Sequence, residues 1–126
     1  MTKKKLNIAL DYDDTITADP NGFKAIVRCF QSLGHKVTIV TLRDSSESTD
    51  LIREFLEKYD VETIFCAGQS KERIVRELGL HMNIWVDDNP RYITNDYPNY
   101  AEIFMTKPDL NKEGPYKQKR PPKELT

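Results

Sequence analysis

The chain has 126 residues, a mass of 14.7 kDa and a formal net charge of −1. This length fits one domain with a hydrophobic core of its own, and a composition of 38% hydrophobic and 31% charged residues excludes a wholly disordered chain. The near-neutral charge gives the whole molecule no strong electrostatic footprint for nucleic acid or membrane.

The start of the chain, residues 1–5, is basic, but the apolar run after it is only five residues long. Such a run is too short for a signal sequence or a membrane span, so we expect a cytoplasmic protein with no membrane partner. The two cysteines, Cys29 and Cys66, are expected to be reduced packing residues, with a disulfide between them as the alternative.

A short apolar run, Leu6–Leu10, predicts a buried strand that leads directly into the acidic stretch Asp11-Tyr12-Asp13-Asp14-Thr15. Carboxylates in that position cost free energy to desolvate unless a cation or hydrogen-bond donors meet them. Ligands of open α/β sheets bind just outside the carboxyl ends of the strands. The stretch therefore predicts a metal ion with a reacting group beside it.

Strand and helix patterns alternate through the rest of the chain. A helix is expected after Asp19-Pro20, with Gly34 at its end. Further helices are expected over about 51–59 and 71–78, further strands over 36–41, 61–66, 83–86 and 101–105, and an irregular segment or short helix over 90–98.

This alternation predicts a Rossmann-like α/β fold, with a parallel sheet of about five strands and helices on both faces. Residues 1–106 are the expected folded domain. Residues 107–126 contain four prolines and a net charge of +3, which predicts an extended or disordered basic tail.

Three more elements place chemically useful residues at the same edge of such a sheet. Thr41 ends the second strand and Arg43 follows it, Lys71 opens the third helix, and Asp87-Asp88 follows the fourth strand. Because the carboxyl ends of parallel strands meet at one edge, we expect these groups to lie near the acidic stretch.

Four motifs in this order resemble those of the haloacid-dehalogenase-like (HAD) phosphohydrolases. They are Asp-x-Asp-x-Thr at residues 11–15, Thr41, Lys71 and the acidic pair Asp87-Asp88. The resemblance covers roughly residues 6–105. Asp14 stands where the family often has Gly, although Asp also occurs there.

The resemblance implies a Mg²⁺-dependent phosphomonoester hydrolase that works through an aspartyl-phosphate intermediate. Asp11 would be the nucleophile, and Asp13 the general acid and then the general base. Asp11 and Asp87 would bind the metal through their side chains and Asp13 through its main-chain carbonyl. Asp88 would bind the metal through water or fix the lysine.

The resemblance also implies a substrate-binding set, which consists of Thr41, Lys71, Arg43 and Thr15. For Arg43 a surface pairing with Asp44 or Glu47 is an equal alternative. Taken alone, Thr41 also fits a hydroxyl that caps a turn, and Lys71 a solvated charge. His35 and His81 are expected at the opposite, amino end of the sheet, and Trp85 in the core.

HAD enzymes choose substrates largely with cap domains inserted at two places, where this chain has only residues 16–22 and 67–70. We therefore expect a capless member with an open cleft. That cleft fits a nucleic-acid end or a phosphoprotein, or a nucleotide or small metabolite enclosed by a second subunit in a homo-oligomer. The basic segment Lys117-Gln118-Lys119-Arg120 favours a nucleic-acid end, as does the base-stacking capacity of Tyr92, Tyr97, Tyr100 and Tyr116. Ordinary solvation of the segment and packing of the tyrosines are the stronger explanation of each.

The competing class of function is not enzymatic. It is a module that binds Mg²⁺ or phosphate without turnover, or a scaffold that acts through its basic tail. Loss of Asp11 or Asp13 would mark such a protein, and both residues are present.

Overall fold

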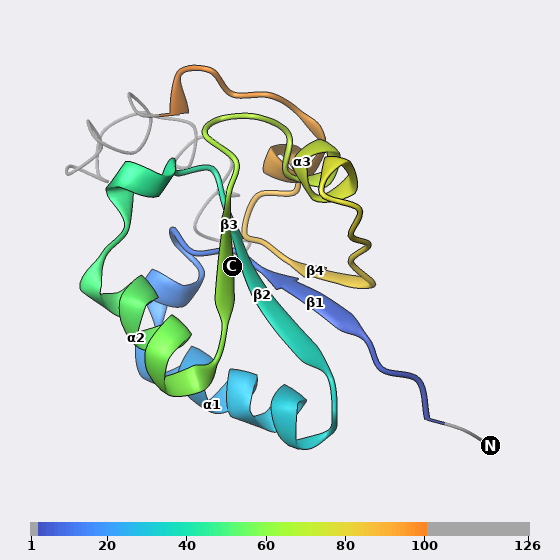
Figure 1. The fold of residues 1–126 in the computed structure, drawn as a ribbon. Coiled ribbons are helices and arrows are strands. Elements are labelled where there is room, and N and C mark those ends of the chain that lie inside the picture. The colour runs from blue at the N-terminus through green and yellow to red at the C-terminus, as the bar shows by residue number, and fades with distance from the viewer. Residues whose placement is uncertain (1–2, 101–126) are drawn as a thin grey trace, which may run out of the picture.

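The structure is a computed structural model that describes residues 3–100, in which strands and helices alternate as predicted (Figure 1). In chain order the elements are β1 (Asn7–Leu10), η1 (Ile16–Ala18), α1 (Pro20–Ser32), β2 (Lys36–Thr41), η2 (Ser45–Glu47), α2 (Asp50–Tyr59), β3 (Glu62–Phe65), α3 (Lys71–Glu77), β4 (Ile84–Val86) and α4 (Arg91–Thr94). The strand expected over 101–105 and the tail 107–126 lie outside the described residues.

The four described strands form one sheet in the order β3-β2-β1-β4, and every pairing is parallel. The predicted α/β fold with a parallel sheet is therefore confirmed. The chain moves outward from β1 to β3, and then crosses back through α3 so that β4 pairs with the free side of β1. A reversal of this kind opens a crevice at the carboxyl ends of the two strands that flank it, which here are β1 and β4.

Helices lie on both faces of the sheet, with α1 and α2 on one face and α3 on the other (Figure 1). Successive strand residues point to opposite faces, so Ile8 and Leu10 pack toward α1 and α2 while Ala9 packs toward α3. The first apolar layer includes Ile8, Leu10, Val37, Ile39, Val27, Ile52 and Phe55. The second includes Ala9, Val40, Cys66, Val75 and Met82.

The local signals for α1 and β2 act as predicted. Asp19 accepts a hydrogen bond from the Gly22 amide at 3.0 Å, and Pro20 occupies the first helical position. Gly34, after the helix, has φ +90°, a conformation that glycine adopts without steric cost. β2 then begins at Lys36 and is buried from its second residue onward.

The outer part of the sheet differs from expectation at Trp85. Trp85, which was predicted to lie in the core, packs against the second apolar layer but is only half-buried. The prediction assumed a strand covered on both sides, but β4 is an edge strand among residues 3–100. Ile84 in the same strand is 38% exposed.

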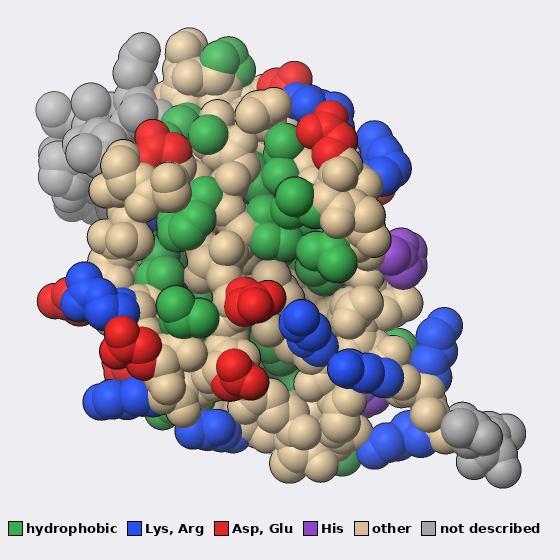
Figure 2. All heavy atoms as spheres, in the orientation of Figure 1, with side chains coloured by type: hydrophobic (Ala, Val, Ile, Leu, Met, Phe, Trp, Pro, Cys, Tyr) green, Lys and Arg blue, Asp and Glu red, His purple; other side chains and the backbone are tan. Residues whose placement is uncertain are grey.

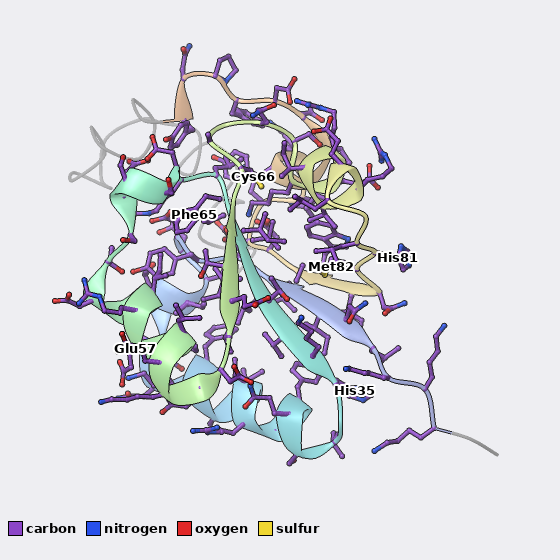
Figure 3. The ribbon with its side chains drawn as sticks, in the orientation of Figure 1. His35, Glu57, Phe65, Cys66, His81 and Met82 are labelled. Atoms are coloured by element: carbon purple, nitrogen blue, oxygen red, sulfur yellow. The ribbon has the colours of Figure 1, made fainter. Side chains whose placement is uncertain are left out.

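His35 and His81 lie at the amino end of the sheet, away from the carboxyl ends of the strands (Figure 3). His35 accepts a hydrogen bond from the Leu6 amide through Nδ1, and the main-chain oxygen of His81 accepts one from the Asn7 side chain. Neither histidine therefore belongs to the acidic cluster. Every helix within residues 3–100 is too short or too polar to cross a lipid bilayer.

A small aromatic cluster lies just beyond the carboxyl end of β2, around Leu42. Tyr92 and Tyr100 are buried against Leu42, and the ring of Tyr97 meets that of Tyr92 edge-on with centroids 4.7 Å apart. Tyr92 and Tyr100 are therefore packing residues, whereas Tyr97 is half-buried. Tyr116 lies outside the described residues.

Candidate active site

The acidic stretch after β1 forms a tight turn that folds back on Asp11. The Asp11 amide donates to the Val86 carbonyl at 2.9 Å, which ties the start of the turn to β4. Asp14 has φ +64°, a left-handed conformation that Asp and Gly tolerate better than most residues, and its amide donates to Thr17 Oγ1. The turn brings the Thr15 hydroxyl to Asp11, where it donates to Oδ2 at 2.8 Å.

Lys71, the first residue of α3, reaches this turn from the loop after β3. Its ammonium lies 2.7 Å from Asp11 Oδ1 and 2.7 Å from Asp87 Oδ2, and the side chain is 1% exposed. A solvated surface charge, the alternative for this residue, is excluded. A cation is disfavoured at a helix N-terminus by the helix dipole, and burial alone would lower its pKa. The two carboxylates outweigh both effects, and the pKa of Lys71 is raised.

Asp11, Asp87 and Asp88 form a cluster in which one carboxylate oxygen from each lies within 4.8 Å of the others. Burial raises the pKa of all three carboxyl groups, to about 7 for Asp11 despite the opposing ammonium of Lys71. When ionised, the three carboxylates and the single ammonium carry a formal charge of −2. Closely spaced oxygen ligands with that charge fit a hard divalent cation such as Mg²⁺.

The two residues of the acidic pair have different partners. Asp87 accepts from Lys71 through Oδ2 and from the Asn89 amide through Oδ1, so it fixes the lysine. Asp88 is exposed and interacts with the carboxyl group of Asp11 instead. Of the two roles expected for Asp88, fixing the lysine therefore falls to Asp87, because the hydrogen bonds of the Lys71 ammonium within residues 3–100 go to Asp11 and Asp87.

Asp13 and Arg43 form a second pair beside the cluster. Nε and one terminal nitrogen of Arg43 donate to the two carboxylate oxygens of Asp13, each at 2.9 Å. The other terminal nitrogen donates to the main-chain oxygen of Glu47 at 3.2 Å, and the guanidinium lies 5.2 Å from the centre of the Tyr12 ring. The side-chain pairing of Arg43 with Asp44 or Glu47, the predicted alternative, does not occur in the structure.

Thr41 ends β2, the strand beside β1, and is 1% exposed. Its hydroxyl oxygen accepts from the Arg43 amide at 3.2 Å, as expected for a hydroxyl that caps a turn. No acceptor for the hydroxyl hydrogen is present among residues 3–100, so that hydrogen remains available to a ligand.

The structure thus brings the predicted residues into two adjoining groups. Asp11, Thr15, Lys71, Asp87 and Asp88 form the first, and Asp13 with Arg43 and Thr41 the second. Sequence reasoning did not predict that residues 44–47 form a turn whose main chain accepts a hydrogen bond from Arg43. The spacing Asp44-x-x-Glu47 is that of a capping box, and η2 contains one.

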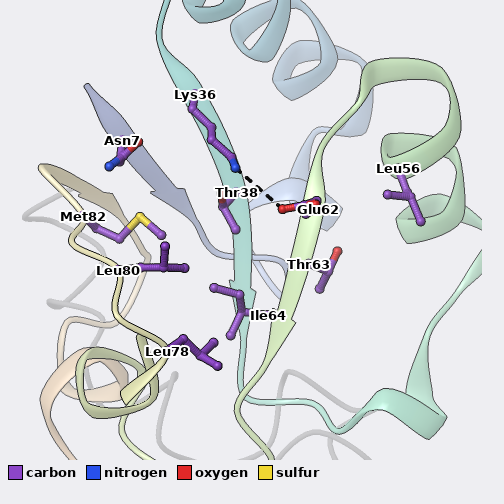
Figure 4. Close-up of a pocket in the computed structure, with 10 residues that line it drawn as sticks. All are labelled: Asn7, Lys36, Thr38, Leu56, Glu62, Thr63, Ile64, Leu78, Leu80 and Met82. Atoms are coloured by element: carbon purple, nitrogen blue, oxygen red, sulfur yellow. Dashed lines mark ion pairs between the residues drawn. The ribbon is translucent and has the colours of Figure 1, made fainter. Parts of the chain in front are cut away.

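An apolar groove of about 550 Å³ lies elsewhere, near the amino ends of β1, β2 and β3 (Figure 4). Hydrophobic side chains gather on this face between α2 and α3 (Figure 2), and Leu56, Leu78 and Leu80 are 45–58% exposed there. The residues that line the groove include none of the predicted site residues.

In comparisons with known proteins, no family model, curated protein or solved structure matches this chain. The functional argument therefore depends on the site itself.

Proposed function

We propose that this protein is a Mg²⁺-dependent phosphomonoester hydrolase of the capless HAD type, which acts through an aspartyl-phosphate intermediate. The observation that carries the proposal is the setting of Asp11. This buried carboxylate is held from two sides by Lys71 and Thr15, at the carboxyl end of β1, in a cluster of three carboxylates.

The carboxylates of Asp11, Asp87 and Asp88 would hold the Mg²⁺ ion, with the main-chain carbonyl of Asp13 as a further ligand by analogy with the family. Their spacing and formal charge fit such an ion. When bound, the cation supplies the positive charge that lets an anionic nucleophile approach an anionic phosphate. The remaining chemistry belongs to side chains of the protein.

In the first step an oxygen of Asp11 attacks the phosphorus atom. A P–O bond to Asp11 forms while the P–O bond to the leaving group breaks, and Asp13 transfers its proton to the leaving oxygen. The hydrogen bonds from Thr15 and Lys71 fix the orientation of the attacking carboxylate before the substrate arrives.

In the second step a water molecule attacks the phosphorus of the aspartyl-phosphate. Asp13, now ionised, accepts a proton from that water, the P–O bond to Asp11 breaks, and inorganic phosphate leaves. Asp11 returns as a carboxylate and Asp13 as an acid. Splitting the hydrolysis in this way replaces one difficult displacement by two easier ones.

Two donors are available for the oxygens of the transferring group. Lys71 has three N–H donors, of which two are taken by Asp11 and Asp87 among the described residues. The Thr41 hydroxyl hydrogen is the second. These groups would neutralise charge that the carboxylates otherwise repel.

The substrate class stays open. The chain passes from β1 to α1 through only a turn and η1, and from β3 to α3 through residues 66–70, which supports a cleft without a lid. An open cleft suits the end of a nucleic acid or a phosphoprotein. It also suits a nucleotide or small metabolite enclosed by a second subunit.

The test is phosphate release by the full-length chain, with Mg²⁺ or with EDTA. The substrates are an aryl phosphate, mononucleotides, 3′- and 5′-phosphorylated oligonucleotides, sugar phosphates and a phosphopeptide. We expect Mg²⁺-dependent release that Asp11→Asn abolishes while the circular dichroism spectrum is retained. Full activity of Asp11→Asn would contradict the role of the nucleophile. Mg²⁺ binding without release from any substrate would favour the non-catalytic module.

A further inference from the structure

A chain of hydrogen bonds connects the last described residue, Tyr100, to Asp13 in the candidate active site. The phenol of Tyr100 donates to Glu47 Oε1 at 2.6 Å and also lies 3.2 Å from Asp44 Oδ2. Burial and these two carboxylates raise the pKa of Tyr100, so the phenol keeps its proton and remains a donor. Tyr100 therefore contacts both Glu47, the last residue of η2, and Asp44, the residue that caps η2.

The η2 turn links the phenol of Tyr100 to the guanidinium of Arg43. Oε1 of Glu47 accepts from the Asp44 amide at 3.0 Å, and Asp44 in turn accepts from the Ser46 amide, so the turn is closed on itself. The main-chain oxygen of Glu47 then accepts from Arg43 at 3.2 Å. A shift of η2 would thus displace the acceptor that holds one end of the guanidinium.

The guanidinium of Arg43 in turn holds the carboxylate of Asp13. Its two parallel bonds to the carboxylate, both 2.9 Å, define the plane as well as the location of the Asp13 side chain. The ring of Tyr12 supports the guanidinium from another side, and the Tyr12 hydroxyl lies 2.8 Å from Thr49 Oγ1, at the start of α2. Arg43 therefore has little freedom apart from movement of η2.

The ring of Tyr100 is itself held against the loop after β3. It packs on Leu42 in the aromatic cluster, and a Cβ at Gly68 would lie 2.9 Å from its Cδ1 atom. The Tyr97 amide donates to the Gly68 carbonyl, which ties the same segment to that loop. The position of the phenol is thus fixed by packing, while η2 is joined to α2 by the extended residues Ser48 and Thr49.

We propose that Tyr100 is a positioning residue for Asp13, acting through Glu47 and Arg43. This inference rests on the proposed function, in which Asp13 protonates the leaving oxygen. Loss of the phenolic hydroxyl would let η2 and Arg43 shift, so that the carboxyl of Asp13 would meet the leaving oxygen less often in the reactive orientation. Asp11 and the carboxylates of Asp87 and Asp88 lie outside this chain of contacts and would be unaffected.

This position for Tyr100 predicts a dependence on the leaving group. An alkyl phosphate needs its leaving oxygen protonated, whereas 4-nitrophenyl phosphate departs as a stable anion and needs little help from a general acid. In the full-length chain with Mg²⁺, we expect Tyr100→Phe to lower kcat/KM about tenfold for an alkyl phosphate, because kcat/KM reports the step in which Asp13 protonates the leaving oxygen. We expect kcat/KM for 4-nitrophenyl phosphate to change by less than about twofold, since the later hydrolysis of the aspartyl-phosphate does not enter this ratio.

Tyr97→Phe is the matched control, because it removes a phenol from the same aromatic cluster. Among residues 3–100 the Tyr97 hydroxyl has no hydrogen-bond partner, so this variant should match the wild-type protein on both substrates. A second readout needs no turnover. In the metal-free protein, the NMR resonance of the Arg43 Nε–H group should shift or broaden in Tyr100→Phe and stay in place in Tyr97→Phe.

Equal losses of kcat/KM on both substrates, or no loss of kcat/KM together with an unmoved Arg43 resonance, would overturn the role of Tyr100. These outcomes require an active wild-type protein. A wild-type protein that releases phosphate from neither substrate would instead contradict the proposed function, and this inference with it. The two failures are therefore distinguished by the wild-type measurement.

Discussion

The ammonium of Lys71 lies 2.7 Å from Oδ1 of Asp11, a residue sixty positions earlier in the chain. The pair joins the first residue of α3 to the turn after β1, and Asp87 after β4 meets the same ammonium. One buried cation thus connects three of the four segments whose motifs resemble those of HAD phosphohydrolases.

Removal of Lys71 should destabilise the protein. We expect Lys71→Met to cost about 3 kcal/mol of unfolding free energy near pH 7.5, because it leaves buried carboxylates without their counter-charge. The loss should be smaller near pH 5.5, where more of these carboxyl groups are protonated. Urea denaturation of metal-free protein at both pH values measures it.

Lys36→Met is the control for that measurement. Lys36 pairs with Glu62 at 3.7 Å on an exposed surface, where an ion pair contributes little. A cost for Lys71→Met no larger than that of Lys36→Met would show that the buried pair does not stabilise the fold.

The stability of the metal-free protein should fall as the pH rises from about 4 to about 7. Burial raises the pKa of Asp11 from 3.8 to about 7, so the folded protein keeps a proton in this range that the unfolded chain has already lost. Thermal unfolding in EDTA should therefore give a lower Tm at the upper end of the range. Mg²⁺ should reverse the loss there, because it binds the ionised carboxylates.

Asp11→Asn removes the titrating group and should flatten this pH dependence. A wild-type Tm in EDTA that rises from pH 5 to pH 7 would contradict the raised pKa of Asp11. A decline of Tm in Asp11→Asn as large as in the wild-type protein would show that another group causes it.

Much of the fold and of the site follows from local sequence signals. The bounds of β2 match the β-branched run, and the acidic groups meet because the strands are parallel. The pairing of Arg43 with Asp13 could not be predicted, because sequence proximity pointed to Asp44 and Glu47. It arises because β1 and β2 are neighbours, which places the turns after both strands side by side. The half-burial of Trp85 likewise depends on strand order, which strand propensity does not encode.

Gly68 should be less tolerant of substitution than Gly79. Both have strongly positive φ, +80° and +77°, so alanine pays about 1 kcal/mol in backbone strain at either position. At Gly68 the new Cβ would also lie 2.5 Å from the Tyr97 carbonyl oxygen, whereas at Gly79 nothing lies within 4 Å. We expect Gly68→Ala to cost about 3 kcal/mol in urea denaturation. Equal costs for the two variants would show that the segment at Tyr97 yields freely.

The two cysteines should differ sharply in reactivity. Both are free, with Cys29 exposed on α1 and Cys66 buried, and burial raises the pKa of the Cys66 thiol to about 11. A thiol reagent near pH 8 should therefore label Cys29 quickly and Cys66 only after unfolding. Figure 3 shows Cys66 just after β3. Rapid labelling of both thiols in the folded protein would show that this region opens readily.

The most direct test of the central claim is to trap the phosphoryl group on Asp11. In Asp13→Asn the intermediate should accumulate with 4-nitrophenyl phosphate and Mg²⁺, because the leaving group needs little acid assistance while the attacking water has lost its base. We expect a burst that approaches one nitrophenolate per protein, and a phosphoryl group on the peptide that contains Asp11 after an acid quench. Asp11→Asn/Asp13→Asn should show neither. A wild-type protein that releases phosphate with Mg²⁺, combined with phosphorylation elsewhere or a burst that survives without Asp11, would contradict the account.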